Sequence, residues 1–125
     1  MKNFQLLYKK AFALSPERRL TLHANCGGVA SALMTQKGNV FTGICIDASC
    51  GIGFCAEHAA IAEMLKSGES RIAEIIAVKD DKTVLSPCGR CREFIMQINT
   101  DNKNTVVHFS KTKIKRLSQL LPDNW

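Results

Sequence analysis

Apolar and polar positions follow two different periods along the chain, and these periods predict helices and strands. Apolar residues from Phe4 to Phe12 recur at the three- and four-residue spacing of an amphipathic helix, which Ser15-Pro16 ends or redirects. The β-rich runs at 29–35 and 40–46 flank the turn-like sequence QKGN. Two such runs joined by a short Gly/Asn turn predict a β-hairpin.

After this hairpin the pattern alternates between strand and helix. We expect a helix over about 55–66, a strand over 72–78, a helix over about 87–98 and a strand over 105–109. Such units are built as parallel strands with right-handed helical crossovers. Two consecutive crossovers place both helix N-termini at the carboxyl ends of neighbouring strands. The starts of the two helices should therefore meet in space.

Composition indicates one domain that spans residues 1–125. A chain of 125 residues, 46% of them hydrophobic, is long enough for a single core without disulfides. No run approaches the ~18 apolar residues that span a bilayer, and the N-terminus lacks the apolar block and cleavage site of a signal peptide. We therefore expect a cytoplasmic protein without a membrane partner, in which the six cysteines stay reduced.

The net charge of +6 invites a nucleic-acid interpretation, because clustered Lys and Arg side chains bind phosphate. The charge is dispersed, however, and its densest run, KTKIKR at 111–116, contains no aromatic residues. A solvated helix face accounts for this run about as well as any partner. We therefore do not expect nucleic acid as a partner.

The residues capable of chemistry gather at the two predicted helix starts. Cys55 and Glu57 open the first helix. The segment SPCGRCRE opens the second, and its Ser-Pro pair suits the N-cap and the first helical position. Cys88 and Cys91 follow, and a spacing of three places both thiols on one side of a helical turn. Three thiols and a carboxylate are therefore expected to converge.

Three converging cysteines favour zinc. C-x-x-C alone also suits a redox dithiol, and Cys55 supplies the third ligand that makes zinc the better interpretation. Helix N-termini further favour thiolates through the dipole and free N–H groups. Three protein ligands leave one position open, where a water is acidified and attacks as hydroxide. Glu57, in the first turn beside Cys55, is placed to take the water's proton without binding the metal.

The spacing also allows a structural zinc site. His58 lies three residues after Cys55, so these two residues and the C-x-x-C pair would form a closed Cys3His site without catalysis. Glu57 would then merely complement the helix dipole. The three remaining thiols are expected to be buried or incidental: Cys26, Cys45 and Cys50.

The paired motif resembles a known family. C-A-E at the start of an apolar helix, followed by S-P-C-G-R-C-R, is similar to the zinc-dependent cytidine deaminases. The segments VASAL, VFTGICI, LSPCGRCRE and QLLPDNW resemble the blasticidin-S deaminase branch, so the resemblance covers most of the chain. It implies an α/β fold, a three-layer α/β/α sandwich with a five-stranded mixed sheet, as well as a homotetramer and one Zn²⁺ per chain. It also favours the open catalytic site over the closed structural one.

The resemblance implies roles for individual side chains. Cys55, Cys88 and Cys91 would hold zinc, and Glu57 would be the catalytic proton shuttle. This carboxylate would take a proton from water, deliver it to N3 of the cytosine ring and then pass a second proton to the departing amino group. The implied reaction converts cytidine or deoxycytidine to uridine or deoxyuridine and ammonia, as in pyrimidine salvage.

Backbone groups and neighbouring cations would complete this site. By the same resemblance the N–H of Ala56 would meet the pyrimidine carbonyl, the N–H of Cys88 the attacking oxygen and the carbonyl of Ser86 the departing amine. Zinc with three thiolates carries a net charge of about −1, which neighbours must offset. Many relatives have arginine directly after the catalytic glutamate, whereas this chain has His58. We expect His58 and Arg90 to donate to the thiolates; the alternative is a solvent-facing pair without a role.

The residues expected to bind the sugar of the substrate differ from the family pattern. Typical cytidine deaminases carry N-x-E on the strand before the first ligand, where it holds the ribose hydroxyls. The matching stretch here is Cys45-Ile46-Asp47. Asp47 can accept a hydrogen bond from a hydroxyl, whereas Cys45 is a poor substitute for an amide. This departure is shared in kind with the blasticidin-S deaminase branch, which also keeps an aromatic C-terminus like Trp125. A cytosine nucleoside analogue of the blasticidin type is therefore the second candidate substrate, with Trp125 as a candidate contact.

Overall fold

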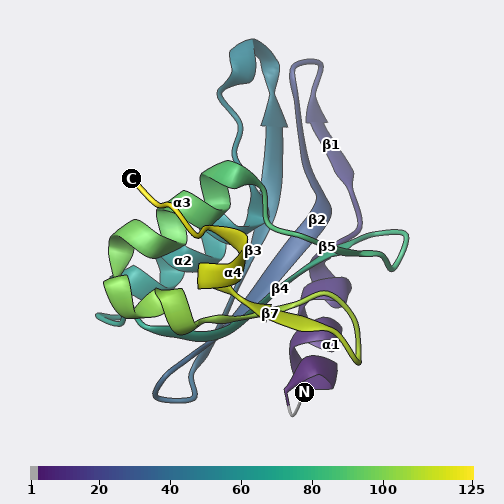
Figure 1. Cartoon of the computed structure of the whole chain (residues 1–125). Helices are drawn as coiled ribbons and strands as arrows, with labels where there is room; N and C mark the ends of the chain where they lie inside the picture. Colours follow the sequence, from purple (N-terminus) through teal and green to yellow (C-terminus); the bar gives the residue numbers. More distant parts are fainter. Residues whose placement is uncertain (1–2) are drawn as a thin grey trace.

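Helices cover both faces of one mixed β-sheet in the computed structural model, which describes residues 3–125 (Figure 1). The helices are α1 (Phe4–Leu14), α2 (Ala56–Lys66), α3 (Gly89–Ile98) and α4 (Leu117–Leu120), with 3-10 turns η1 (Ser49–Gly51) and η2 (Thr100–Asn104). The strands are β1 (Arg18–Thr21), β2 (Ala24–Thr35), β3 (Val40–Ala48), β4 (Ile72–Lys79), β5 (Val84–Leu85), β6 (Val106–His108) and β7 (Ile114–Arg116). The longest helices have 11 residues, and none of those described has the length and apolar character needed to cross a bilayer.

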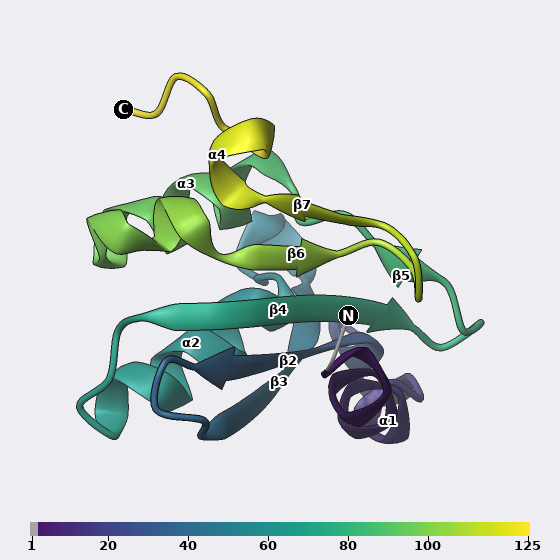
Figure 2. The ribbon, with the colours of Figure 1, turned by 60° about the horizontal axis from the view of Figure 1, so that its bottom comes forward.

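The sheet has seven strands, where five were expected. Figure 2 shows β7, β6, β4, β2 and β3 side by side, and β1 and β5 pair with β2 and β4. The predicted hairpin is confirmed, with β2 and β3 antiparallel and Met34 opposite Val40. The parallel pairing of β4 and β6 is also confirmed. The expectation that β3 and β4 are neighbours is wrong, because β2 lies between them and pairs with both.

Two apolar layers explain why β2 takes this central position. One layer joins α1 to one face of the sheet and includes Ala30, Ala32 and Ile76. The other joins α2, α3 and α4 to the opposite face and includes Leu33 and Ile75. Both β2 and β4 therefore contribute buried side chains to both faces, as central strands do. The predicted three-layer α/β/α arrangement is confirmed.

The basic run near the C-terminus is not a helix. Residues 114–116 form β7, which is antiparallel to β6 and pairs Val107 with Lys115. β7 lies at the edge of the sheet. Charged side chains are common on edge strands because they discourage pairing with a strand of another molecule. The interpretation of 111–116 as a solvated helix face is therefore wrong.

Helix α3 begins two residues later than predicted. Cys88 has an extended conformation (φ −68°, ψ 169°) and is the N-cap, so Gly89 is the first helical residue. The Ser86 hydroxyl does not cap the helix and accepts a hydrogen bond from Nη2 of Arg92 at 2.8 Å. Nε of Arg92 also donates to the carbonyl of Pro87 at 2.8 Å. This arginine holds the segment that leads into α3.

Helix α2 packs directly against β3 at Gly43. A Cβ atom at this position would lie 2.6 Å from Cβ of Ala59 and 2.7 Å from the carbonyl oxygen of Ala56, and closer still to the backbone nitrogen of Ala60. Glycine permits this approach because it has no side chain. Since Ala56 opens α2, the contact also fixes how far Cys55 and Glu57 lie from the sheet.

We expect Gly43→Ala to destabilise the fold by about 1–3 kcal/mol, the usual cost of forcing extra atoms into a packed interior. Chemical denaturation measures this change in the free energy of unfolding. Gly89→Ala is the matched control, because its Cβ would meet nothing within 4 Å. Equal stabilities for the two variants would show that the α2 to β3 contact is looser than described.

Candidate active site

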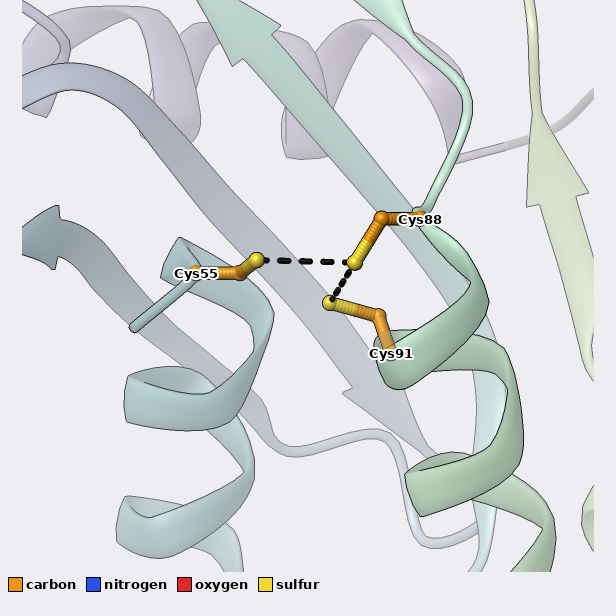
Figure 3. Close-up of side chains that lie close together, drawn as sticks. All are labelled: Cys55, Cys88 and Cys91. Carbon is orange, nitrogen blue, oxygen red and sulfur yellow. Dashed lines mark hydrogen bonds between the residues drawn. The ribbon is translucent and has the colours of Figure 1, made fainter. Parts of the chain in front are cut away.

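Three cysteine thiols meet where α2 and α3 begin. Sγ of Cys55 lies 3.5 Å from Sγ of Cys88, which lies 3.3 Å from Sγ of Cys91. Figure 3 shows the three sulfurs pointing toward one another from the two helix starts. Cys55 and Cys88 are the N-caps of α2 and α3, and Cys91 is fully buried in the first turn of α3. The predicted meeting of the two helix starts is confirmed.

The spacing of the thiols fits a tetrahedral zinc ion. Two sulfurs bound to zinc at about 2.3 Å lie about 3.8 Å apart, close to the 3.3 and 3.5 Å found here. A disulfide requires about 2.05 Å, and all six cysteines are free. Within residues 3–125, Cys55, Cys88 and Cys91 are the one group of candidate ligands close enough to share an ion, all within 4.8 Å of one another. The three thiols fit zinc and leave a fourth position open.

The pKa values of the three thiols are shifted in different directions. Burial raises the pKa of Cys91 far above its usual range, and the nearby charge of Glu57 adds to this effect. Burial also raises the pKa of Cys55. Burial opposes ionisation of Cys88 too, but a hydrogen bond from the backbone N–H of Cys91 and hydrogen bonding between the Cys88 and Cys91 thiols lower the pKa of Cys88 overall. A bound dication reverses this balance, because it stabilises all three thiolates at once.

Glu57 is the carboxylate beside these thiols. It lines the same cavity as Cys55 and Cys88, and it is 5% exposed. Burial raises the pKa of Glu57, since the charged form loses its water. A carboxyl group with a raised pKa, placed next to a metal site, is suited to accept and return protons.

A cavity of about 570 Å³ adjoins the thiols and is of a size that holds a small molecule. Five further residues predicted for the site line it: Cys45, Asp47, Ala56, Ser86 and Arg90. The Cys45 thiol donates to the carbonyl of Gly27. The structure therefore brings the predicted sugar-side residues into the same cavity as the predicted catalytic ones.

His58 lies outside this cavity lining. Its ring stacks on Phe94, with centroids 4.6 Å apart and planes 5° from parallel. It does not belong to the thiol cluster, so the closed Cys3His site does not form. Nε2 of His58 is buried without a hydrogen-bond partner, and in the described chain neither His58 nor Arg90 donates to a sulfur. The expected donation to the thiolates is therefore not observed. Burial, followed by the charge of Arg90, lowers the pKa of His58.

The C-terminus is also placed differently from the prediction. Trp125 is 93% exposed and is not part of the cavity lining. Its backbone N–H donates to Oε1 of Glu93 at 3.0 Å, which holds the tail against α3. Within this chain, Trp125 is therefore not brought to the site.

Sequence analysis missed several residues that line the cavity. Gly27 and Gly28 have φ values of 82° and 87° and form a bulge where the register of β2 on β3 shifts. A glycine pair inside a strand pattern is a signal for such a bulge. Glu17 and Asp80 lie beside it. Asp80 directly follows β4, and the carboxyl ends of strands are where α/β sheets bind ligands.

Comparison with known proteins agrees with this geometry. The sequence matches the family described as the cytidine and deoxycytidylate deaminase zinc-binding region over residues 1–108. The cytidine deaminase of Mycobacterium tuberculosis strain H37Rv is 31% identical over 96 residues, which cover 76% of this chain and 70% of that protein. The blasticidin-S deaminase of Bacillus cereus is 33% identical over 82 residues, which cover 58% of this chain and 59% of that protein.

Solved structures extend the similarity to the whole fold. The crystal structure of cytidine deaminase from Mycobacterium tuberculosis matches with a TM-score of 0.81 at 25% identity, covering 98% of this chain and 97% of that chain. Cytidine deaminase from Burkholderia pseudomallei matches with a TM-score of 0.75 at 25% identity, covering 98% of both chains. The resemblance found in the sequence is confirmed, and the three thiols account for the zinc-binding description. This chain belongs to the cytidine and deoxycytidylate deaminase family of zinc-dependent hydrolases.

Proposed function

We propose that this protein removes the 4-amino group from the cytosine ring of a free nucleoside by zinc-dependent hydrolysis. Cytidine and deoxycytidine are the proposed substrates, and uridine or deoxyuridine and ammonia are the products. One observation carries this proposal: the buried carboxylate of Glu57 shares a cavity with the thiols of Cys55 and Cys88. The similarity to proteins named cytidine deaminase supports it.

The thiol cluster and Glu57 have separate tasks in this reaction. When held by Cys55, Cys88 and Cys91, zinc acidifies a water molecule and so supplies a nucleophile at neutral pH. Glu57 accepts a proton from the attacking water and delivers it to N3 of the ring, which makes C4 electrophilic. The water oxygen bonds to C4, Glu57 takes the remaining proton from this oxygen and passes it to the amino group, and the C4–N bond breaks. Cytidine and water thus give uridine and ammonia, with one carboxylate acting as base and then as acid.

Backbone groups at the helix starts orient the ring in this proposal. We assign the N–H of Ala56 to the pyrimidine carbonyl, the N–H of Cys88 to the attacking oxygen and the carbonyl of Ser86 to the departing amine. All three residues line the cavity. The N–H groups are suited to this role because the first turn of a helix has no intrahelical acceptor for them.

The sugar occupies the part of the cavity lined by Cys45 and Asp47. Asp47 is exposed at the cavity surface and accepts from a sugar hydroxyl, while Cys45 is engaged with the carbonyl of Gly27. Blasticidin S is the second candidate substrate, supported by the similarity to the Bacillus cereus blasticidin-S deaminase. A non-catalytic zinc protein has no such support, because His58 stacks on Phe94 and not on the thiol cluster.

We extend the proposal to a cytoplasmic homotetramer that acts in pyrimidine salvage. A cluster of three free thiols supports a reducing compartment. Association of copies of the chain would bury exposed apolar side chains such as Ile52 and Trp125, which are 75% and 93% exposed.

The proposed site predicts how much zinc the protein binds and through which atoms. We expect about one zinc per chain, bound by three sulfurs and one light atom, as an open three-thiolate site requires. Elemental analysis gives the stoichiometry, and X-ray absorption gives the ligand set. Chelation is expected to abolish deamination, and added zinc to restore it. Four protein ligands that include a His58 nitrogen would favour the closed structural site instead.

Substitution of Glu57 should have a different effect from substitution of a metal ligand. Glu57→Gln should keep zinc and fold yet lose at least about 10²-fold in turnover, the low end of general acid–base contributions. Cys88→Ala should lose zinc as well as activity. Glu63→Gln is the control, because it removes an exposed carboxylate from the same helix. Full activity in Glu57→Gln would show that another group moves the protons.

A further inference from the structure

The side chain of Arg92 joins three segments of the chain at the start of α3. Nε of Arg92 donates to the carbonyl of Pro87 at 2.8 Å, and Nη2 donates to the hydroxyl of Ser86 at 2.8 Å. Nη1 donates to the carbonyl of Leu120 in α4 at 3.1 Å. The side chain is half-buried and is not part of the cavity lining. The guanidinium group therefore holds neighbours of the site without touching the cavity itself.

The segment held by Arg92 lies between β5 and α3 and has few other supports. β5 is two residues long and pairs with β4. Within residues 3–125, the hydrogen bonds found for Ser86 and Pro87 are those donated by Arg92. Pro87 is buried, whereas Ser86 is exposed in the cavity lining. The position of the peptide group between these two residues therefore depends on the buried ring of Pro87 and on the guanidinium group of Arg92.

The bonds from Arg92 leave the carbonyl oxygen of Ser86 free. Arg92 binds the hydroxyl of Ser86 and the next carbonyl along the chain, that of Pro87. The carbonyl of Ser86 accepts no hydrogen bond from any other described residue. A planar guanidinium group with two donors in use fixes orientation as well as position. The carbonyl of Ser86 is thus an oriented acceptor without an intramolecular donor.

We propose that Arg92 is a positioning residue, which directs the Ser86 carbonyl toward the departing amino group. This inference rests on the proposed function, in which that carbonyl accepts a hydrogen bond from the amine. Once Glu57 has protonated the amino group, the C4–N bond breaks and nitrogen leaves as ammonia with the electron pair. A carbonyl dipole held at this nitrogen stabilises the protonated amine before the bond breaks. Loss of Arg92 should therefore slow the loss of ammonia more than the addition of water.

A substrate whose leaving group has no N–H separates this role from a merely structural one. The riboside of 4-chloropyrimidin-2-one gives the same uridine as cytidine does. The water oxygen bonds to C4, the C4–Cl bond breaks and chloride leaves with the electron pair. One water proton ends on N3 and the other is released to solvent. Chloride offers no proton to the Ser86 carbonyl, so its departure does not depend on this acceptor.

The test measures kcat and KM for both substrates on the zinc-loaded enzyme, corrected for hydrolysis without enzyme. Arg92→Met keeps the apolar stem of the side chain and removes its three hydrogen bonds. We expect kcat for cytidine to fall at least about 10-fold and kcat for the chloro substrate less than about three-fold, since a misplacement of about 1 Å costs up to about 10²-fold. Zinc content should be unchanged, because the backbone N–H of Arg92 still donates to the carbonyl of Cys88.

Two further variants and a control define which property of Arg92 matters. Arg92→Lys should behave like Arg92→Met, because an ammonium group cannot hold Ser86 and Pro87 in one planar fork. If Arg92→Met does not fold, Ser86→Ala removes one of the bonds and keeps the carbonyl; kcat for cytidine alone should then fall by about three-fold, the effect of one hydrogen bond.

Arg19→Met is the matched control. Arg19 also donates two side-chain hydrogen bonds, to Asn25 and to the carbonyl of Leu22, but lies outside the cavity lining. Its loss should leave the kcat values for both substrates unchanged.

The outcomes separate this inference from the proposed function. Equal losses of kcat with both substrates in Arg92→Met would show that Arg92 only supports the fold, and would overturn the inference. Full activity toward cytidine in Arg92→Lys, or in Ser86→Ala, would overturn it as well. A wild-type enzyme that releases no ammonia from cytidine, with zinc bound, would instead overturn the proposed function.

Discussion

The site depends on the backbone contact between the first turn of α2 and strand β3 at Gly43. Backbone atoms of α2 occupy the space that a side chain at this position would need. Cys55 and Glu57 therefore project from a fixed point, while Cys88 and Cys91 approach from α3. A shared ion tolerates little error in these positions, because metal–sulfur distances vary by only about 0.2 Å. Packing between apolar residues thus sets the geometry of the polar site.

Different charges surround the two ends of the cavity, and this arrangement suits the proposed deamination. The two helix N-termini supply partial positive charge where thiolates must form. Burial of Glu57 raises the pKa of its carboxyl group and favours proton transfer. Asp47 and Glu17 line the part of the cavity that contains Cys45, where their charges add to the burial that raises the pKa of its thiol. In the proposed function, one end of the cavity holds the reacting ring and the other end holds the sugar.

Local patterns in the sequence predicted α1, the β2–β3 hairpin, the two crossover helices and the metal cluster, but not β1, β5, β7 or α4. The two helix starts with their thiols are recognisable because a spacing of three residues has a fixed meaning on a helix. The order of the strands could not be predicted from these patterns. It depends on β2, which is buried on both faces and pairs with both β3 and β4. The stacking of His58 on Phe94 and the approach of Glu17 to Gly28 are likewise tertiary contacts that spacing does not reveal. The residues that form the metal cluster could therefore be predicted from the sequence. The directions in which their neighbours point could be seen only in the folded structure.

The central claim is that water, activated between the thiol cluster and Glu57, replaces the amino group at C4. Deamination of cytidine in ¹⁸O-labelled water tests this most directly, with the uridine analysed by mass spectrometry and the ammonia quantified. The account predicts one ¹⁸O atom in the uracil ring of each uridine and one ammonia released per uridine. Unlabelled uridine, or cytidine left unchanged by the zinc-loaded protein, would contradict it.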